Sequence, residues 1–284
     1  KLLALALEKP LLAEADQARM KADLTSLLAR LEERPGYRAE RLLTERAFKK
    51  HPYASAPYGT AASVAALGAE DVRNYLNTYV TRGNVLIAAG GDVDASLLDD
   101  MLTPVVDALA ANDSGPVAVT KTNAEGAGET LRQEMDVPQT TLLFLAPAIA
   151  RDDPRFYAQY LLNYILGGTT LSSRLGQEVR QNKGLVYGIS TTLDIKRGAA
   201  TIGGALATRN ANAEAALEAV KAVLADVHTK GVTTEECADA KQYALGSFAR
   251  ELDGAGAVSQ FVLMMQIHTL GEDYIEKRED YFRN

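Results

Sequence analysis

The hydrophobic period of the sequence changes near Gly184, and this change limits the local fold more than any other feature. Leu171, Leu175 and Val179 recur every four residues, the spacing of one stripe on a helix. Gly184 predicts the end of that helix. The period then becomes two, which places alternate residues on one face of a strand: Leu185, Tyr187, Ile189, Thr191, Leu193 and Ile195. The chain therefore turns from helix to strand within a few residues.

Two polar side chains lie seven positions apart across this corner. Arg180 is off the apolar stripe, in the last turn of the predicted helix, and Tyr187 is on the following strand. A cation and a phenol so placed can reach one polar group, such as a peptide carbonyl or a developing oxyanion. The residues alone also allow simpler interpretations. Arg180 gains from the helix dipole, and Tyr187 belongs to the core because its face is apolar.

The order of residues around this corner resembles the M16 zinc metallopeptidases, the inverzincins, which include pitrilysin, insulin-degrading enzyme and mitochondrial processing peptidase. The matching segments are Leu166-Gly167-Gly168, Ser173-Arg174-Leu175, Arg180 and Gly184-Leu185-Val186-Tyr187. In that family the Arg and Tyr help to bind substrate across from the zinc. The resemblance implies a substrate-binding role for Arg180 and Tyr187, whereas Arg174 is interpreted as a structural or ion-pairing residue.

The pattern along the chain predicts an α+β fold. The chain has 284 residues, a length more typical of two domains than of one. Residues 1–110 are mostly helical in pattern, with Val85 to Ala89 as a short buried strand. Residues 111–130, with their Gly, Asn, Ser and Pro, predict a linker, and 131–284 form a second region. In that region the pattern predicts strands at residues 141–146 and 199–208 and a helix from Arg155 to Leu166. Thr233-x-x-Glu236 is a capping box for a further helix, and Glu235-Glu236 is interpreted as a solvated face. By resemblance these are two similar M16 modules, each a β-sheet with helices on one face.

The resemblance extends toward the N-terminus through Lys9-Pro10-Leu11-Leu12 and Gly91-Asp92-Val93-Asp94. In that frame Lys1 falls well inside the first module. We therefore expect residues 1–110 to be an incomplete module and the chain to be a piece of a longer protein.

The family's zinc site requires H-x-x-E-H on one helix, in which both His bind zinc and the Glu activates a water. The chain has three His, at positions 51, 228 and 268, and none lies in such a motif. An ungapped alignment from Lys9 places the family's third ligand, a Glu, on Leu27, which cannot bind zinc. We therefore expect no catalytic residue and no metal ligand in this chain.

Three functions remain open. The leading hypothesis is a non-catalytic subunit of a heteromeric M16 zinc endopeptidase, with zinc on a partner chain that carries H-x-x-E-H. Arg180 and Tyr187 would then contribute to binding the peptide substrate. The first alternative is an active M16 peptidase whose motif lies upstream of Lys1. The second is an M16-like structural subunit without a proteolytic role, such as the core proteins of respiratory complexes.

Composition limits the partners. The formal net charge is −7 and no Lys/Arg cluster stands out, which argues against nucleic acid. No apolar run approaches the ~20 residues that span a bilayer. Paired active and inactive M16 subunits resemble bacterial envelope proteins, so we expect a periplasmic location, with the cytoplasm as the alternative.

Overall fold

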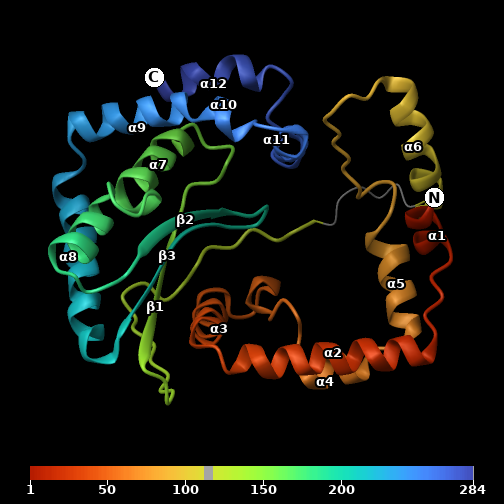
Figure 1. The fold of residues 1–284 in the computed structure, drawn as a ribbon, viewed down its shortest axis with the longest axis horizontal. Coiled ribbons are helices and arrows are strands. Elements are labelled where there is room, and N and C mark those ends of the chain that lie inside the picture. The colour runs from red at the N-terminus through yellow and green to blue at the C-terminus, as the bar shows by residue number, and fades with distance from the viewer. Residues whose placement is uncertain (112–117, 284) are drawn as a thin grey trace. The chain divides into compact units, whose positions relative to one another are not determined.

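The structure, a computed structural model, describes residues 1–111 and 118–283 (Figure 1). Its backbone contacts form two compact units. The first unit consists of Lys1–Ala29, Pro57–Val119 and Ala249–Tyr274. The second consists of Arg30–Ala56, Thr120–Phe248 and Ile275–Asn284.

The second unit contains an antiparallel sheet of three strands in the order β1-β3-β2. The strands are β1 (Gln139–Pro147), β2 (Ile189–Ile195) and β3 (Ala200–Arg209). The central strand, β3, pairs with β1 from Gln139 opposite Arg209 to Pro147 opposite Thr201. It pairs with β2 from Ile189 opposite Leu206 to Ile195 opposite Ala200. The strands expected near residues 141–146 and 199–208 are thus present.

The main core lies between this sheet and helical segments that follow β1 and β3. Leu142, Leu206 and Ile189 lie opposite one another across the three strands and belong to the same apolar cluster. Helix α8 (Ala213–Lys230) adds buried small side chains, including Ala216 and Ala219. The remaining elements of the second unit are α7 (Phe156–Asn163), the π-helical segments η2 (Tyr164–Gly168) and η3 (Gly176–Asn182), α9 (Thr234–Gly246) and α12 (Tyr274–Arg283) from Ile275 onward. Helix α10 (Phe248–Glu251) belongs to the first unit from Ala249 onward.

The expectation of helices on one face only is wrong for this sheet. Leu145 alternates with the core residue Phe144, so it points to the other face, where it packs with Ala47 and Phe48 of α3 (Pro35–Phe48). Just after α3, Tyr53 Oη accepts a hydrogen bond from the Gly198 amide at 3.0 Å. The near-continuous apolar run in β1 is consistent with a strand that is covered on both faces.

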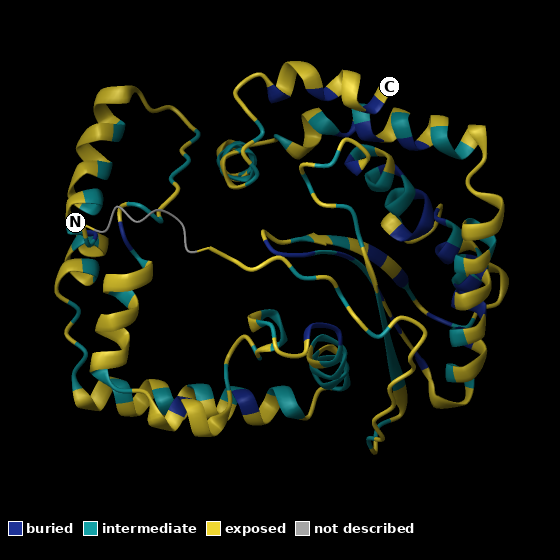
Figure 2. Cartoon of the chain, turned by 180° about the vertical axis from the view of Figure 1, so that it is seen from behind, coloured by how far each residue is buried: buried dark blue, intermediate teal, exposed yellow. Residues whose placement is uncertain are grey.

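The described residues of the first unit form helices. They are α1 (Leu2–Glu8), the part of α2 (Glu14–Glu32) up to Ala29, α4 (Ala61–Ala66), α5 (Ala69–Tyr79), α6 (Ala95–Ala108) and α11 (Ala255–Ile267). Asp94 caps α6 by accepting a hydrogen bond from the Leu97 amide at 2.8 Å. Figure 2 shows that α2 is largely exposed, with Leu28 as its buried residue.

The short buried strand expected at Val85 to Ala89 is not formed, and this prediction is wrong. Within the described chain, no backbone ladder pairs with residues 85–89, and Val85 and Leu86 are exposed. A strand needs a neighbour to satisfy its amides and carbonyls, so apolar composition alone does not produce one. In residues 1–111 the β-structure is a single bridge between Thr81 and Ala110. A sheet in the first region remains a prediction.

None of the helices in the described part of the chain is both long enough and apolar enough to cross a membrane. The expected linker at 111–130 lies partly outside the described residues. The boundaries at 110 and 131 stay a prediction.

Candidate functional site

The helix that carries Arg180 is held against the core by two side chains. Leu175 and Val179 are 0% exposed and pack in the same cluster as Ala216 and Ala219 of α8. Leu171, the third residue of the predicted stripe, is 55% exposed and precedes the helix. That part of the prediction is wrong because the chain is still in a turn at Leu171, where a four-residue spacing does not place side chains on one face.

The end of this helix places Arg180 beside the following segment. The Lys183 amide donates to the Glu178 carbonyl, five residues back, which is the π-helical pattern. Gly184 then adopts a left-handed conformation (φ 60°), which glycine tolerates best, and the Leu185 amide bonds back to the Val179 carbonyl. The glycine stop expected from the sequence is therefore present.

Tyr187 is on the surface. It is 91% exposed, whereas the strand that follows begins only at Ile189. Its predicted place on the buried face of the strand is wrong, and so is the simpler interpretation of Tyr187 as a core residue. Because residues 184–188 are not in the ladder, the alternation has not yet started, and Val186 enters the core instead.

Arg180 and Tyr187 come together across this corner. The Cζ atom of Arg180 lies over the Tyr187 ring, 5.5 Å from its centroid, a cation–π distance. Among the residues that the structure describes, this ring is the one partner of the half-buried Arg180 side chain. The guanidinium donors and the phenol hydroxyl are thus free to bind an acceptor such as a carbonyl or carboxylate oxygen.

The loop before the helix is tied back to it by side-chain hydrogen bonds. Gln181 Nε2 donates to the Leu171 carbonyl at 2.7 Å, and Ser173 Oγ donates to the Thr169 carbonyl. Ser173 is 1% exposed, so its hydroxyl serves the local backbone rather than a ligand. These contacts hold residues 169–173 in place close to the segment that carries Arg180.

Arg174 is an ion-pairing residue, as expected, and its partner is Glu236. Its Nε donates to Glu236 Oε1 at 2.6 Å, and its Nη2 donates to Glu236 Oε2 at 2.7 Å. The sequence suggested that the Glu235-Glu236 pair lies on a solvated face, which is wrong for Glu236. The guanidinium of Arg174, above all, lowers the pKa of Glu236 from its usual 4.5 to about 2. The one sequence signal was the Thr233-x-x-Glu236 capping box, which is formed.

The residues present do not fit the family's zinc set. Among the described residues, no three His, Cys, Asp or Glu side chains gather closely enough to hold a metal ion. Leu27, on which the third ligand would fall, is half-buried on α2 next to the buried Leu28. His51 is engaged in its own turn, where Nδ1 accepts from the Tyr53 amide and Nε2 lies 2.9 Å from the Thr120 carbonyl oxygen.

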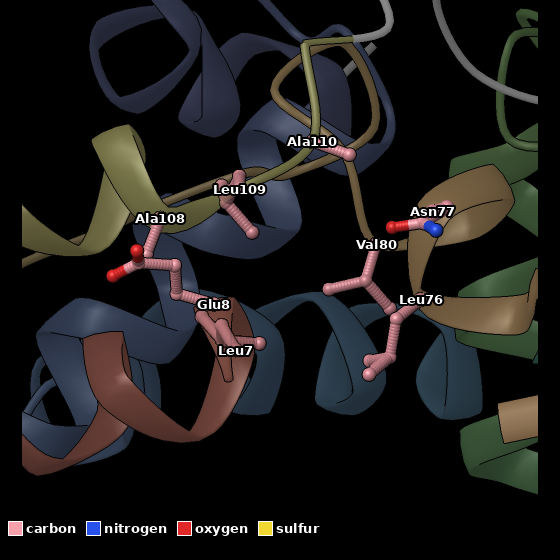
Figure 3. Close-up of a pocket in the computed structure, with 8 residues that line it drawn as sticks. All are labelled: Leu7, Glu8, Leu76, Asn77, Val80, Ala108, Leu109 and Ala110. Carbon is pink, nitrogen blue, oxygen red and sulfur yellow. The ribbon is translucent and has the colours of Figure 1, made fainter. Parts of the chain in front are cut away.

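One small cavity, of about 120 Å³, lies within the first unit (Figure 3). Most of the side chains around it are apolar and come from α1, α5 and the end of α6, such as Leu7, Leu76 and Leu109, whereas most of its exposed lining is polar. Glu8 and Asn77 are its polar side chains. Arg180 and Tyr187 belong to the second unit and take no part in it.

The family model described as peptidase M16 inactive domain matches residues 66–243, which include both Arg180 and Tyr187. The chain belongs to this M16 inactive-domain family.

Its relatives are consistent with that assignment. An uncharacterized zinc protease, YmxG, of Bacillus subtilis is 25% identical over 218 residues, covering 76% of this chain and 52% of that protein. The non-peptidase homolog YmxG of Helicobacter pylori is 23% identical over 242 residues, covering 85% of this chain and 55% of that protein. The chain thus spans about half the length of these curated relatives.

The fold is shared with a solved structure. The crystal structure of the peptidase M16 inactive domain from Pseudomonas fluorescens superposes with a TM-score of 0.87 at 29% identity. The match covers 99% of this chain and 66% of that one. The resemblance inferred from the sequence motifs is thereby confirmed.

Proposed function

We propose that the chain is a non-catalytic part of an M16-type zinc endopeptidase and that Arg180 and Tyr187 bind its peptide substrate. The observation that carries this proposal is the Arg180–Tyr187 pair, a cation without a described carboxylate partner beside an exposed phenol. A partly exposed guanidinium with no carboxylate partner can exchange bound water for a carbonyl oxygen of a ligand. An exposed tyrosine of this size likewise contributes little to the fold.

The two side chains suit a peptide carbonyl. The Arg180 guanidinium would donate a hydrogen bond to the carbonyl oxygen, and Tyr187 Oη would donate to the same oxygen or to the oxyanion that replaces it. Donors held in place before the reaction stabilise a charge that develops in the transition state. In this proposal the two residues bind and orient the substrate and form no bond with it.

The zinc and its activated water would come from a partner chain with H-x-x-E-H. Two observations support this part of the proposal: the described residues hold no cluster of donors suited to zinc, and the matching family model is described as an inactive domain. The two-module architecture and a periplasmic location, with the cytoplasm as the alternative, belong to the same proposal. An active single-chain peptidase is the second candidate, because the Bacillus subtilis relative is named a zinc protease and only 52% of its length is matched by this chain.

The test uses the full-length gene product, alone and mixed with an M16 protein that carries H-x-x-E-H and is encoded nearby. Bound zinc and hydrolysis of fluorescein-labelled casein are measured for both samples. Activity that appears only in the mixture supports the proposal. Zinc and activity in the protein alone would establish the single-chain peptidase instead.

The matched variants test the two residues. Arg180→Ala and Tyr187→Ala should each lower hydrolysis by the mixture at least about tenfold, the loss of roughly one charge-assisted hydrogen bond. Arg197→Ala is the control, because Arg197 is an exposed arginine in the turn between β2 and β3. Equal activity of Arg180→Ala and Arg197→Ala would reject the role of Arg180.

A further inference from the structure

The helix that carries Arg180 is anchored at its other end by an ion-pair network. Arg174 meets Glu236 through two parallel hydrogen bonds of 2.6 and 2.7 Å, and its third nitrogen lies 3.4 Å from Asp226 Oδ2. The side chains of Arg174 and Glu236 are 19% and 29% exposed. A bidentate guanidinium–carboxylate pair of this kind fixes direction as well as distance.

The carboxylate is itself held in place. Glu236 Oε2 also accepts from the Thr233 amide at 2.7 Å, as the third residue of the α9 capping box. Asp226, in the last turns of α8, pairs with Lys230 at 2.5 Å. Arg174 is therefore bonded to the end of α8 and to the start of α9, on both sides of the turn that joins them.

The other tertiary contacts of this helix are of two kinds. Leu175 and Val179 are fully buried and pack on alanines of α8, which holds the segment against the core without a hydrogen-bond direction. Gln181 Nε2 donates to the Leu171 carbonyl, which lies in the loop before the helix. The backbone continues as a π-helix, a rare form that occurs often at functional sites. Arg180 itself touches the Tyr187 ring and has no other described partner to set its direction.

We infer that the Arg174–Glu236 pair is a positioning device that sets the rotation of residues 174–182 and thereby aims Arg180 at Tyr187. Arg174 and Arg180 lie on one short helical segment, so a rotation at its start is transmitted to its end. The inference rests on the proposed role of Arg180 and Tyr187 in peptide binding. Neither Arg174 nor Glu236 touches the substrate in it.

The test compares three substitutions in the full-length protein. Glu236→Gln removes the charge but keeps the capping box, because Gln serves at this position as well as Glu. Arg174→Lys keeps the positive charge but removes the guanidinium group that donates two parallel hydrogen bonds to Glu236. Glu218→Gln is the control, since it removes an exposed ion pair, with Lys221, from the same helix α8.

Two readouts separate geometry from binding. The first is the nuclear Overhauser effect between the Arg180 side chain and the Tyr187 ring, measured with labelled Arg and Tyr. The second is the dissociation constant of fluorescein-labelled casein for the complex with the zinc-bearing partner, measured by anisotropy after the metal is removed. Folding of each variant is checked by thermal melting.

Loss of the Arg180–Tyr187 contact in Glu236→Gln and Arg174→Lys, with the contact intact in Glu218→Gln, supports the inference. The dissociation constant should then rise about fivefold or more, which is less than the effect of deleting Arg180. An unchanged contact in folded Glu236→Gln and Arg174→Lys overturns it. If Glu236→Gln fails to fold, Arg174→Lys alone decides. A lost contact with unchanged casein binding leaves the positioning role standing and rejects the proposed function.

Discussion

Gly167 lies directly against Thr191, the residue that follows Ile189 and Ser190 on β2. A Cβ atom at Gly167 would lie 2.6 Å from Thr191 Oγ1 and 2.8 Å from the Thr191 backbone nitrogen. Thr191 Oγ1 in turn donates to the Asn163 carbonyl at 3.3 Å, which ties β2 to the end of α7. Gly167 is thus required for the close packing of this segment on β2.

Gly167→Ala should therefore lower the free energy of unfolding by about 1–3 kcal/mol, the usual cost of overpacking. The measurement is urea denaturation of the two proteins. Gly246→Ala is the matched control, because Gly246 ends α9 with nothing within 4 Å of its Cβ position. The control should be neutral or more stable by up to about 1 kcal/mol. Equal stability of both variants would show that β2 shifts enough to accommodate the added methyl group.

Leu175→Ala should destabilise the protein by about 2–5 kcal/mol, because it leaves a cavity in a fully buried site. Leu171→Ala, on the same predicted stripe but 55% exposed, should change stability by less than about 0.5 kcal/mol. Both values come from denaturant curves. Similar losses in the two variants would contradict the placement of Leu171 on the surface.

Tyr187→Ala should leave the melting temperature almost unchanged, since the ring is 91% exposed and its main contact is Arg180. Differential scanning calorimetry of the wild type and variant checks this. The buried neighbour Val186 is the comparison, and Val186→Ala should lower the melting temperature clearly. A large loss in Tyr187→Ala would mean that the tyrosine supports the fold rather than a ligand.

The acid limb of the stability curve should depend on Glu236. Its pKa is about 2 in the folded protein against a usual 4.5, so the folded state favours the ionised form. The stabilisation is complete above pH 4.5 and is lost as the pH falls toward 2. Glu236→Gln should therefore be less stable than the wild type at neutral pH and approach it at low pH. Parallel curves for the two proteins between pH 4.5 and 2 would contradict the assignment.

The sequence predicted those parts of the second unit in which local pattern and tertiary contact agree. The helix beginning near Phe156, the strands β1 and β3 and the Thr233 capping box are all present. The stop at Gly184 was predictable because it depends on backbone conformation alone. The family assignment followed from the order of residues around that stop.

The errors arose where a side chain's surroundings depend on distant segments. Period two continues through Tyr187 and predicts a strand there, yet pairing with β3 begins only at Ile189. The segment from Val85 to Ala89 is apolar enough for a strand but has no described ladder partner. The local sequence predicts a surface position for Glu236, because its partner Arg174 lies 62 positions earlier. None of these facts is present in a local window of sequence.

Arg180 and Tyr187 are supplied by one uninterrupted stretch, turned back on itself at Gly184. An insertion or deletion of one residue between positions 181 and 186 would therefore separate the two side chains while Leu175 and Val179 stayed in the core. The seven-residue spacing between this arginine and this tyrosine is thus a requirement of the pair that the core does not share.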